Sequence, residues 1–362
     1  MRRKKILIIV DSLGVGGTQE QIYCFVKYLK EYEFTILSIF SDDVYSERIN
    51  SEGGKVIFLS ELKNDLFKKF LSIPIIFFKF QRKKKWILSY DWINIRLPFS
   101  LLVSSFFNLY KFNYVSFTVE CSYGQLNLYE KIIFKIYLKK YTIIFFGLPG
   151  RLSFKNLNIP LNAIYDDVPF TAIRAVSKNP VNYENKINFL FISRLIPIKG
   201  LEDAVLLIEN YNNLYDEKIN LHVIGDGPEL LRIKKYCIKK SIKYIHFYGF
   251  INNLEDYYLN ATALIKTSFN EPANSVVREF LALGKIVFTT IEGPTDKELE
   301  RNRLIIGIKR DDINFSSMVI NQKLSYTVGN ESFELKDKFN LNFGNEFVKS
   351  QYIKVIESSC RN

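Results

Sequence analysis

The sequence repeats one local pattern, in which an apolar run is followed by a glycine-containing turn and then by an amphipathic helix. Lys5–Val10 is almost entirely apolar, as buried parallel strands are, and Gly14-Val-Gly-Gly17 follows it. The next helix has its apolar face at Ile22, Phe25, Val26 and Leu29. Further strands are predicted at Phe34–Phe40, Lys55–Leu59, Trp92–Ile95, Asn113–Val119 and Tyr141–Phe146. This alternation predicts a doubly wound α/β fold.

The second half of the chain restarts the same pattern. The predicted strand Ile187–Ile192 precedes the turn Ser193–Gly200 and a helix. The predicted strand Ile219–Ile224 then precedes the turn Gly225-Asp-Gly-Pro228 and the basic amphipathic helix Glu229–Lys240. Two copies of the pattern indicate two domains of the same class.

The length of 362 residues also suits two domains. Between Phe146 and Lys186 the periodicity weakens and three prolines interrupt the sequence, so we place the interdomain linker there. No strand follows the last predicted helix, Gly344–Ser358, so this helix must pack on a domain that is already built. The expected division is an N-terminal domain over 1–170, a C-terminal domain over 171–340 and a final helical segment over 341–362.

Composition excludes several other classes of protein. A chain with 48% hydrophobic and 24% charged residues is typical of soluble globular proteins. Leu97–Leu109, its longest apolar stretch, contains a proline and three serines and is too short to span a bilayer. Met1-Arg-Arg-Lys-Lys runs straight into a buried strand, unlike a signal peptide. Four unpatterned cysteines and two histidines predict no metal site and a cytoplasmic protein.

Positive charge is concentrated in the first half, where residues 1–170 carry about +9 of the net +12. Leu66–Trp86 and Tyr129–Lys140 combine lysines with bulky apolar residues. One interpretation is that these segments lie on an anionic membrane, where each basic residue contributes about 1 kcal/mol. The other is that they are ordinary core helices with a solvated basic side. The sequence leaves both open.

The stretch Thr267–Lys285 carries two carboxylates eight residues apart, Glu271 in a loop and Glu279 inside the helix that follows. An ionised carboxylate accepts hydrogen bonds, so the two could hold hydroxyl groups at two points of an elongated ligand. The start of the helix offers unpaired N–H groups to a phosphate, at Asn274, Ser275 and Val276. The alternative is that both glutamates are solvated surface residues.

Two further turns carry candidate binding residues. Arg194 and Lys199 flank the turn after the strand Ile187–Ile192, where two cations suit a diphosphate, although they could be ordinary surface charges. Gly14 and Gly16 resemble a dinucleotide fingerprint, but its third glycine would fall at Gln19.

Four motifs occur in the second half in a characteristic order and spacing. They are SRLIPIKG (193–200), VIGDGPELL (223–231), HFYGF (246–250) and the pair Glu271 and Glu279. With DSLGVGGTQEQ (11–21) in the first half, the chain resembles family 4 glycosyltransferases of the GT-B fold over nearly its whole length. The resemblance implies two Rossmann-like domains facing a cleft, with the last helix crossing back to the N-terminal domain. It also implies that the first domain lies on the acceptor side and the second binds a nucleotide sugar.

The resemblance also implies roles for individual residues. Arg194 and Lys199 would neutralise the diphosphate leaving group, Glu279 would hold the ribose hydroxyls, and Glu271 would contact the transferred sugar. Glycines of the first loop would let it approach the phosphates, and the segment after the strand near His246 would form the nucleobase pocket. These residues are Gly16 and Gly17 for the loop, and Gly249, Phe250 and Ile251 for the pocket.

Two departures from the family pattern limit what can be carried over. The loop after the first glutamate usually reads glycine, hydrophobic residue, proline, whereas here it reads Pro272-Ala273-Asn274. The identity of the donor sugar therefore cannot be inferred from the family. The family also carries a histidine near the reacting sugar, and either Glu120 or Cys121 takes its place here.

The sequence therefore predicts a retaining, metal-independent glycosyltransferase with a nucleotide diphosphate sugar as donor. The basic first half favours a lipid-linked acceptor, as in the assembly of bacterial lipopolysaccharide O-antigen or capsule, with the protein peripheral on the inner face of the cell membrane. Two rivals are an NAD(P)-dependent oxidoreductase, based on the first glycine-rich turn, and a catalytically silent scaffold of the same fold. Nucleic-acid binding is not expected, because the basic residues form no known recognition module.

Overall fold

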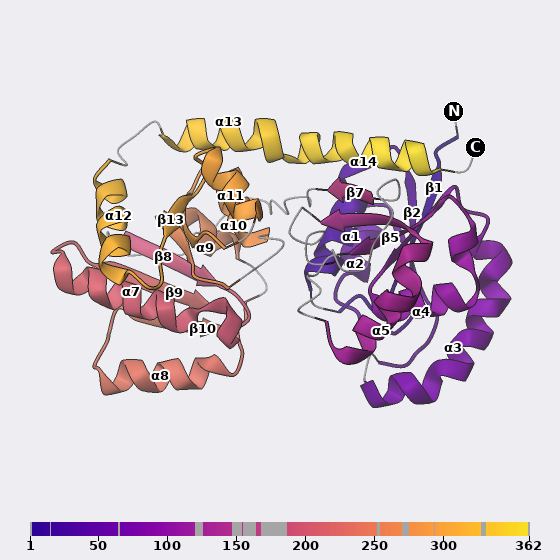
Figure 1. Cartoon of the computed structure of the whole chain (residues 1–362), viewed down its shortest axis with the longest axis horizontal. Coiled ribbons are helices and arrows are strands. Elements are labelled where there is room, and N and C mark those ends of the chain that lie inside the picture. The colour runs from indigo at the N-terminus through magenta and orange to yellow at the C-terminus, as the bar shows by residue number, and fades with distance from the viewer. Residues whose placement is uncertain are drawn as a thin grey trace. The chain divides into compact units, whose positions relative to one another are not determined.

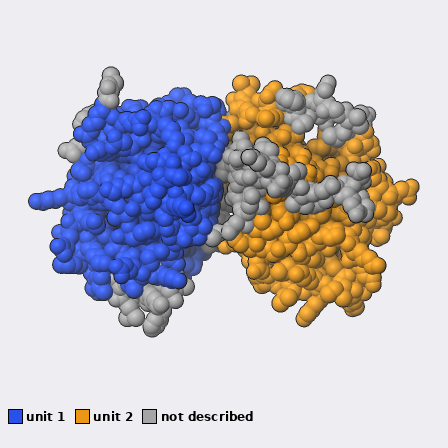
Figure 2. All heavy atoms as spheres, turned by 180° about the vertical axis from the view of Figure 1, so that it is seen from behind, with its two compact units in different colours: residues 1–172, 345–362 blue, residues 173–344 orange. Residues whose placement is uncertain are grey.

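The computed structural model describes residues 2–14, 16–63, 66–119, 126–146, 154, 164–167, 187–251, 254–269, 275–292, 294–326 and 331–360. The chain divides into two compact units (Figure 2). Unit 1 contains Met1–Ala172 together with Asn345–Asn362, and unit 2 contains Ile173–Gly344.

Unit 1 is built on a parallel sheet of seven described strands in the order β3-β2-β1-β4-β5-β6-β7. The central strands are almost fully buried, because helices cover both faces of the sheet, and this explains their continuous apolar runs. The strands are β1 (Lys5–Val10), β2 (Glu33–Ser38), β3 (Lys55–Phe58), β4 (Trp92–Arg96), β5 (Val115–Val119), β6 (Thr142–Phe146) and β7 (Ile164–Asp167).

Strand β7 corrects the sequence analysis, which assigned all of 146–186 to a linker. Residues Ile164–Asp167 pair in parallel with Ile143–Phe146 at the edge of the sheet. This strand has only four residues, two of them aspartates, so it contains no apolar run by which the sequence could reveal it.

Helices cover the two faces of this sheet in separate layers (Figure 1). The first layer, on the face that includes Ile93 and Phe117, contains α3 (Leu66–Ile87), α4 (Pro98–Phe106) and α5 (Leu128–Tyr137). The second layer contains α1 (Gly17–Tyr28), α2 (Ser46–Ser51) and α14 (Asn345–Ser359). Short 3-10 turns at Leu109–Lys111 and Leu138–Lys140 follow α4 and α5.

The last helix, α14, packs on unit 1 through its apolar side. Val348 and Ile356 are fully buried there, and the ring of Tyr352 meets Phe25 of α1 edge to face with 4.3 Å between centroids. Lys349 adds an ion pair to Glu31 at 2.6 Å. The C-terminal helix therefore belongs to the N-terminal fold, as the family resemblance implied.

Unit 2 has a parallel sheet of six described strands in the order β10-β9-β8-β11-β12-β13. Chain order reverses between β8 and β11, which lie side by side, and a doubly wound sheet binds ligands at the carboxyl ends of such strands. The strands are β8 (Ile187–Ile192), β9 (Ile219–Ile224), β10 (Ile245–Gly249), β11 (Ala263–Lys266), β12 (Ile286–Thr290) and β13 (Ile306–Ile308).

Two helical layers also cover the sheet of unit 2 (Figure 1). One contains α7 (Leu201–Leu214), α8 (Glu229–Lys239) and α12 (Ile313–Tyr326). The other contains α9 (Glu255–Asn260), α10 (Ser275–Ala282), α11 (Pro294–Arg301) and α13 (Glu331–Phe343). Both units confirm the doubly wound α/β prediction.

Candidate functional site

The turns after β8 and β9 pack against each other at the carboxyl edge of the second sheet. The amide of Leu195 donates to the carbonyl of Asp226 at 2.8 Å, and the amide of Ser193 donates to Ile224 at 3.1 Å. Gly225 has φ +138°, and a Cβ placed there would lie 1.8 Å from the carbonyl oxygen of Ser193. Only glycine fits this close approach, so the glycine in the β9 turn fixes the position of the β8 turn.

Arg194 and Lys199 both lie on the β8 turn, as predicted. Arg194 is exposed, and Lys199 is partly buried at the end of the 3-10 turn Pro197–Lys199. Gly200 follows with φ +69°, where a Cβ would lie 2.2 Å from the carbonyl oxygen of Thr267. The Thr267 hydroxyl donates to the Gly200 carbonyl at 2.6 Å. The turn with the two cations is therefore fastened to the start of the loop after β11.

The loop after β11 leads to the predicted sugar-binding residues. The amide of Phe269 donates to the carbonyl of Ile198 at 2.8 Å, which ties the loop to the β8 turn. Glu271 and Asn274 lie outside the described residues. Ser275 is exposed as the first residue of α10, and Val276 beside it is partly buried. The structure thus brings the start of α10 to the same edge as the two cations.

Glu279 lies inside α10 and is only 7% exposed. The hydroxyl of Tyr258, on α9, donates to Oε2 of Glu279 at 2.5 Å. The interpretation of Glu279 as a solvated surface residue is therefore wrong. Its side chain is buried, and the Tyr258 hydroxyl helps to orient its carboxylate, which can still accept further hydrogen bonds.

The predicted nucleobase segment lies at the end of β10. Gly249 has φ +71°, and its carbonyl accepts the amide of Gly225 at 2.8 Å. Phe250 is exposed, whereas Ile251 packs partly on the core below α10. An exposed aromatic ring beside the turns after β8 and β9 can stack on a nucleobase.

The first glycine-rich loop belongs to unit 1. Gly16 lies in extended backbone just before α1, and Gly17 is the first residue of that helix. A Cβ at Gly17 would meet nothing within 4 Å, and at Gly16 it would meet only the end of the Gln19 side chain. Glu120 and Cys121, the candidates for the family histidine, lie outside the described residues.

The two histidines of the chain are paired on neighbouring strands, His222 on β9 and His246 on β10. His222 is buried on β9, with Nδ1 2.8 Å from the Tyr248 hydroxyl and Nε2 3.0 Å from Oδ1 of Asn188. Its ring stacks on His246 at 5.0 Å. Burial, together with the charge of His246, lowers the pKa of His222 to about 4.

Sequence analysis missed two residues of this edge. Tyr258 was not recognised, because a tyrosine on a short helix gives no sign of which carboxylate it will meet. Lys266 closes β11 and is 8% exposed, with Nζ 3.6 Å from Oδ1 of Asp296. A lysine at the end of the apolar run Ala263-Leu-Ile is the signal that could have drawn attention to it.

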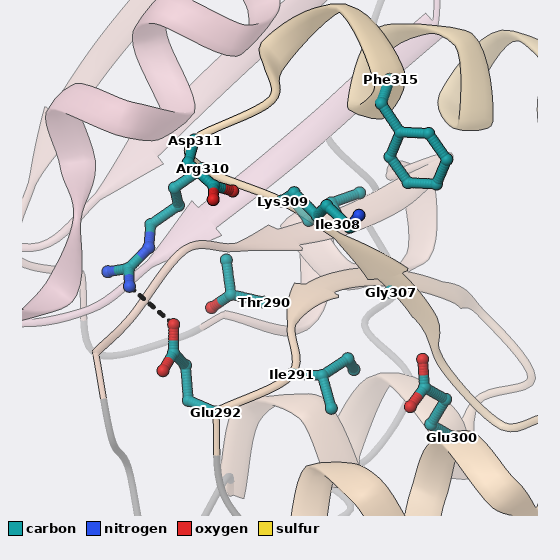
Figure 3. A pocket seen from close by; sticks show the side chains of 10 residues that line it. All are labelled: Thr290, Ile291, Glu292, Glu300, Gly307, Ile308, Lys309, Arg310, Asp311 and Phe315. Carbon is teal, nitrogen blue, oxygen red and sulfur yellow. Dashed lines mark hydrogen bonds and ion pairs between the residues drawn. The ribbon is translucent and has the colours of Figure 1, made fainter.

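A cavity of about 550 Å³ lies beside this edge, at the carboxyl ends of β12 and β13 (Figure 3). At one end the guanidinium of Arg310 pairs with Glu292 at 2.6 Å and covers the ring of Phe269 at 3.3 Å. Glu300 lies at the other end beside Gly307. Carboxylates that accept and a guanidinium that donates can bind the hydroxyl groups of a sugar. The sequence analysis named none of the residues that line it.

In sequence, residues 173–308 match the family model described as glycosyl transferases group 1. In fold, the chain is similar to sucrose-phosphate synthase from Thermosynechococcus elongatus, with a TM-score of 0.77 and 16% identity over 98% of this chain and 99% of that chain. It has the GT-B fold.

Other GT-B structures give comparable values. HepE of Anabaena, in complex with UDP and glucose, has a TM-score of 0.76 and 15% identity over 98% of this chain and 100% of that chain. The lipopolysaccharide outer core galactosyltransferase WaaB has a TM-score of 0.67 and 16% identity over 98% of this chain and 99% of that chain. A search of curated protein sequences found no match. The stretch that matches the group 1 model contains Arg194, Lys199, Gly249 and Glu279.

Proposed function

We propose that this protein is a retaining, metal-independent glycosyltransferase that moves a hexose or related sugar from a nucleoside diphosphate sugar to a glycan acceptor. The observation that carries the proposal is the carboxyl edge of the second sheet. The turn that carries Arg194 and Lys199 lies there, at the reversal of strand order, together with the start of α10, the helix that carries the buried Glu279. The match to the group 1 glycosyltransferase model supports the same assignment.

The chemistry follows from the charges at this edge. Arg194 and Lys199 stabilise the negative charge that develops on the departing diphosphate, and the positive dipole end at the start of α10 favours a phosphate. Glu279, oriented by Tyr258, accepts hydrogen bonds from the ribose hydroxyls, and Glu271 contacts the sugar. Catalysis then rests on positioning and charge stabilisation, and the retained configuration is taken from the family resemblance.

A thermal-shift screen tests the donor class. A ligand at 100 times its dissociation constant stabilises a protein by about 2.7 kcal/mol, so one nucleoside diphosphate series should raise the melting temperature clearly. Slow hydrolysis of the matching sugar conjugate, without any acceptor, would then argue against a silent scaffold. Absence of stabilisation by all diphosphates, together with fluorescence enhancement of bound NADH, would favour the oxidoreductase instead.

The proposed acceptor is lipid-linked, and the proposed setting is the inner face of a bacterial membrane during assembly of lipopolysaccharide O-antigen or capsule. None of the helices in the described part of the chain is both long and apolar enough to span a bilayer. The proposal therefore needs a surface of unit 1 that can lie on a membrane, and the layer of α3, α4 and α5 provides a candidate.

Helix α5 shows this surface most clearly. Its outward side carries Leu128, Ile132 and Ile136, which are 77%, 51% and 52% exposed. Lys135 and Lys139 are exposed on the same side. The opposite side packs on the core, and the only acidic residue of the helix closes its capping box. An outward face that is both apolar and cationic is typical of helices that bind anionic bilayers.

Helix α3 combines the two interpretations that the sequence left open. Ile76 and Phe80 are fully buried in the core, so α3 is a core helix. Ile75 and Phe78 are exposed on its other side, and Arg82 lies 5.8 Å from the Phe78 ring. Lys68 and Lys69, which were predicted to face the membrane, lie outside the residues whose side chains are described.

Sedimentation with anionic vesicles at two salt concentrations tests this surface. Changing Arg82–Lys85 to glutamine should lower binding, because each charge contributes about 1 kcal/mol, and the remaining binding should depend less on salt. The double variant Ile132→Ser/Ile136→Ser should also release protein. The matched control is Leu231→Ser/Ile238→Ser on α8 in unit 2, where both residues are similarly exposed. Equal losses in both double variants would refute the assignment to α5.

A further inference from the structure

Lys266 is the last residue of β11, the strand that lies beside β8 at the reversal of strand order, and it pairs with Thr289 of β12. The lysine is 8% exposed and lines a cavity of about 40 Å³. Ser193, Ser268 and Ser275 line the same cavity, and Ser275 begins α10. The ammonium group is therefore placed at the edge of the sheet where the proposed donor binds.

The hydrogen-bonding capacity of Lys266 is not used within the described structure. Its Nζ lies 3.6 Å from Oδ1 of Asp296, whose side chain is fully buried, and makes no hydrogen bond. Asp296 offsets the charge of the ammonium group, but this separation is too long for a hydrogen bond. Three N–H donors remain to be satisfied, and leaving them unsatisfied in a buried position is costly.

Lys285, a partly buried lysine of unit 2, shows the contrast. Lys285 donates to the carbonyl oxygens of Leu259 at 2.8 Å and Ala261 at 2.9 Å, so its ammonium group joins two segments of the fold. Lys266 makes no such hydrogen bonds in the described structure, although it is buried at the carboxyl edge of the second sheet. The free hydrogen-bond donors of Lys266 therefore fit a contact with a ligand better than a role in joining two segments of the fold.

We propose that Lys266 donates hydrogen bonds to a phosphate oxygen of the nucleotide sugar, while Asp296 holds the ammonium group in place. This inference rests on the proposed function, because its ligand is the sugar donor. The choice of phosphate follows from the start of α10 on the same cavity, because the first turn of a helix presents N–H groups and the positive end of the helix dipole to an anion. With Arg194 and Lys199 on the adjoining turn, three cations share the diphosphate.

The test must separate a ligand contact from a structural ion pair between β11 and α11. Lys266→Met removes the ammonium group but leaves Asp296 buried without it, which can prevent folding. The double variant Lys266→Met/Asp296→Asn removes both charges, so it leaves no buried carboxylate without the ammonium group and can be tested in the folded state. Calorimetry with UDP, GDP and ADP, and with the corresponding monophosphates and sugar conjugates, measures the affinities. Lys285→Met is the control, since it removes a partly buried lysine whose hydrogen bonds go to the carbonyl oxygens of Leu259 and Ala261.

We expect the folded double variant to bind the diphosphate at least about tenfold more weakly, the loss that accompanies one charged hydrogen bond. Monophosphate binding should change much less, and Lys285→Met should lower the melting temperature without this loss. A deficit confined to the sugar conjugate would overturn the phosphate assignment in favour of a sugar oxygen. Unchanged diphosphate affinity in the double variant would overturn the inference and leave the proposed function standing. Failure of the wild-type protein to bind any diphosphate would overturn the proposed function itself.

Discussion

The hydrogen bond from Tyr258 to Glu279 should be worth a measurable part of both stability and nucleotide affinity. The two residues are 5% and 7% exposed, and the atoms are 2.5 Å apart, so water screens the interaction little. Hydrogen bonds to charged groups contribute about 1.5–3 kcal/mol, and Tyr258→Phe removes only the hydroxyl. The phenylalanine keeps the edge contact with Phe280, at 4.8 Å between centroids. We expect the free energy of unfolding of unit 2 to fall by about 1.5–3 kcal/mol.

Nucleotide affinity should fall as well, because Glu279 would have to be ordered by the ligand instead of by Tyr258. Ordering one such side chain costs about 0.5–1.5 kcal/mol, which corresponds to a loss of about two- to tenfold. Tyr257→Phe is the matched control, since Tyr257 lies next in the chain and is only partly buried. It should change neither quantity by more than about 0.5 kcal/mol, as is usual for surface substitutions.

A double-mutant cycle with Glu279→Gln isolates the interaction. Both tryptophans, Trp86 and Trp92, lie in unit 1, so urea unfolding of unit 2 is followed by circular dichroism, and tryptophan fluorescence serves as the internal control. Residues in direct contact give coupling energies of about 0.5–3 kcal/mol. A coupling energy indistinguishable from zero would refute the reasoning, because it would mean that the hydroxyl and the carboxylate act independently.

Three further predictions follow from the same edge and its surroundings. Arg194→Ala and Lys199→Ala should each lower turnover at least about tenfold, since each removes a charge from the leaving diphosphate; wild-type rates in steady-state assays of both would contradict their assignment. Glu279→Gln should weaken binding of the free nucleoside diphosphate, whereas Glu271→Gln should mainly impair use of the complete donor; equal calorimetric losses would argue against this division. Because the pKa of His222 is lowered to about 4 in the folded protein, the unfolded chain binds the extra proton between about pH 6.5 and 4, and stability should fall as pH falls through that range. His222→Gln should flatten this part of the pH–stability curve, and a curve of unchanged slope would show that other groups cause it.

The strands that the sequence revealed are those buried on both faces. Ile187–Ile192 and Ile219–Ile224 have the same bounds in the structure as in the sequence analysis, because continuous apolar runs mark buried parallel strands. The sequence analysis did not predict β7, because this edge strand of four residues contains two aspartates and no continuous apolar run. Helix α13, Glu331–Phe343, was also not anticipated, although Phe339 and Phe343 bury one side of it against α10 and its neighbours.

The candidate site was predictable only where a residue's chemistry depends on its place in the local pattern. Arg194 and Lys199 flank a turn after a strand, so their position at a carboxyl end followed from the chain alone. The hydrogen-bond donor to Glu279 is instead Tyr258, which lies 21 residues away on another helix. The pattern of apolar residues around Glu279 placed it in a helix but gave no sign of that partner.

Lys266 shows why strand order, rather than strand position, limits such prediction. The sequence places Lys266 at the end of one strand, and Arg194 and Lys199 after another strand that is distant along the chain. The crossover connections decide which strand ends become neighbours in the sheet. In the sheet of unit 2, β8 lies beside β11 because the chain adds strands first on one side of β8 and then on the other. That reversal brings Lys266 next to Ser193 and the start of α10. A positive charge that looks like the accidental end of an apolar run therefore becomes a candidate for phosphate binding only once the reversal is known.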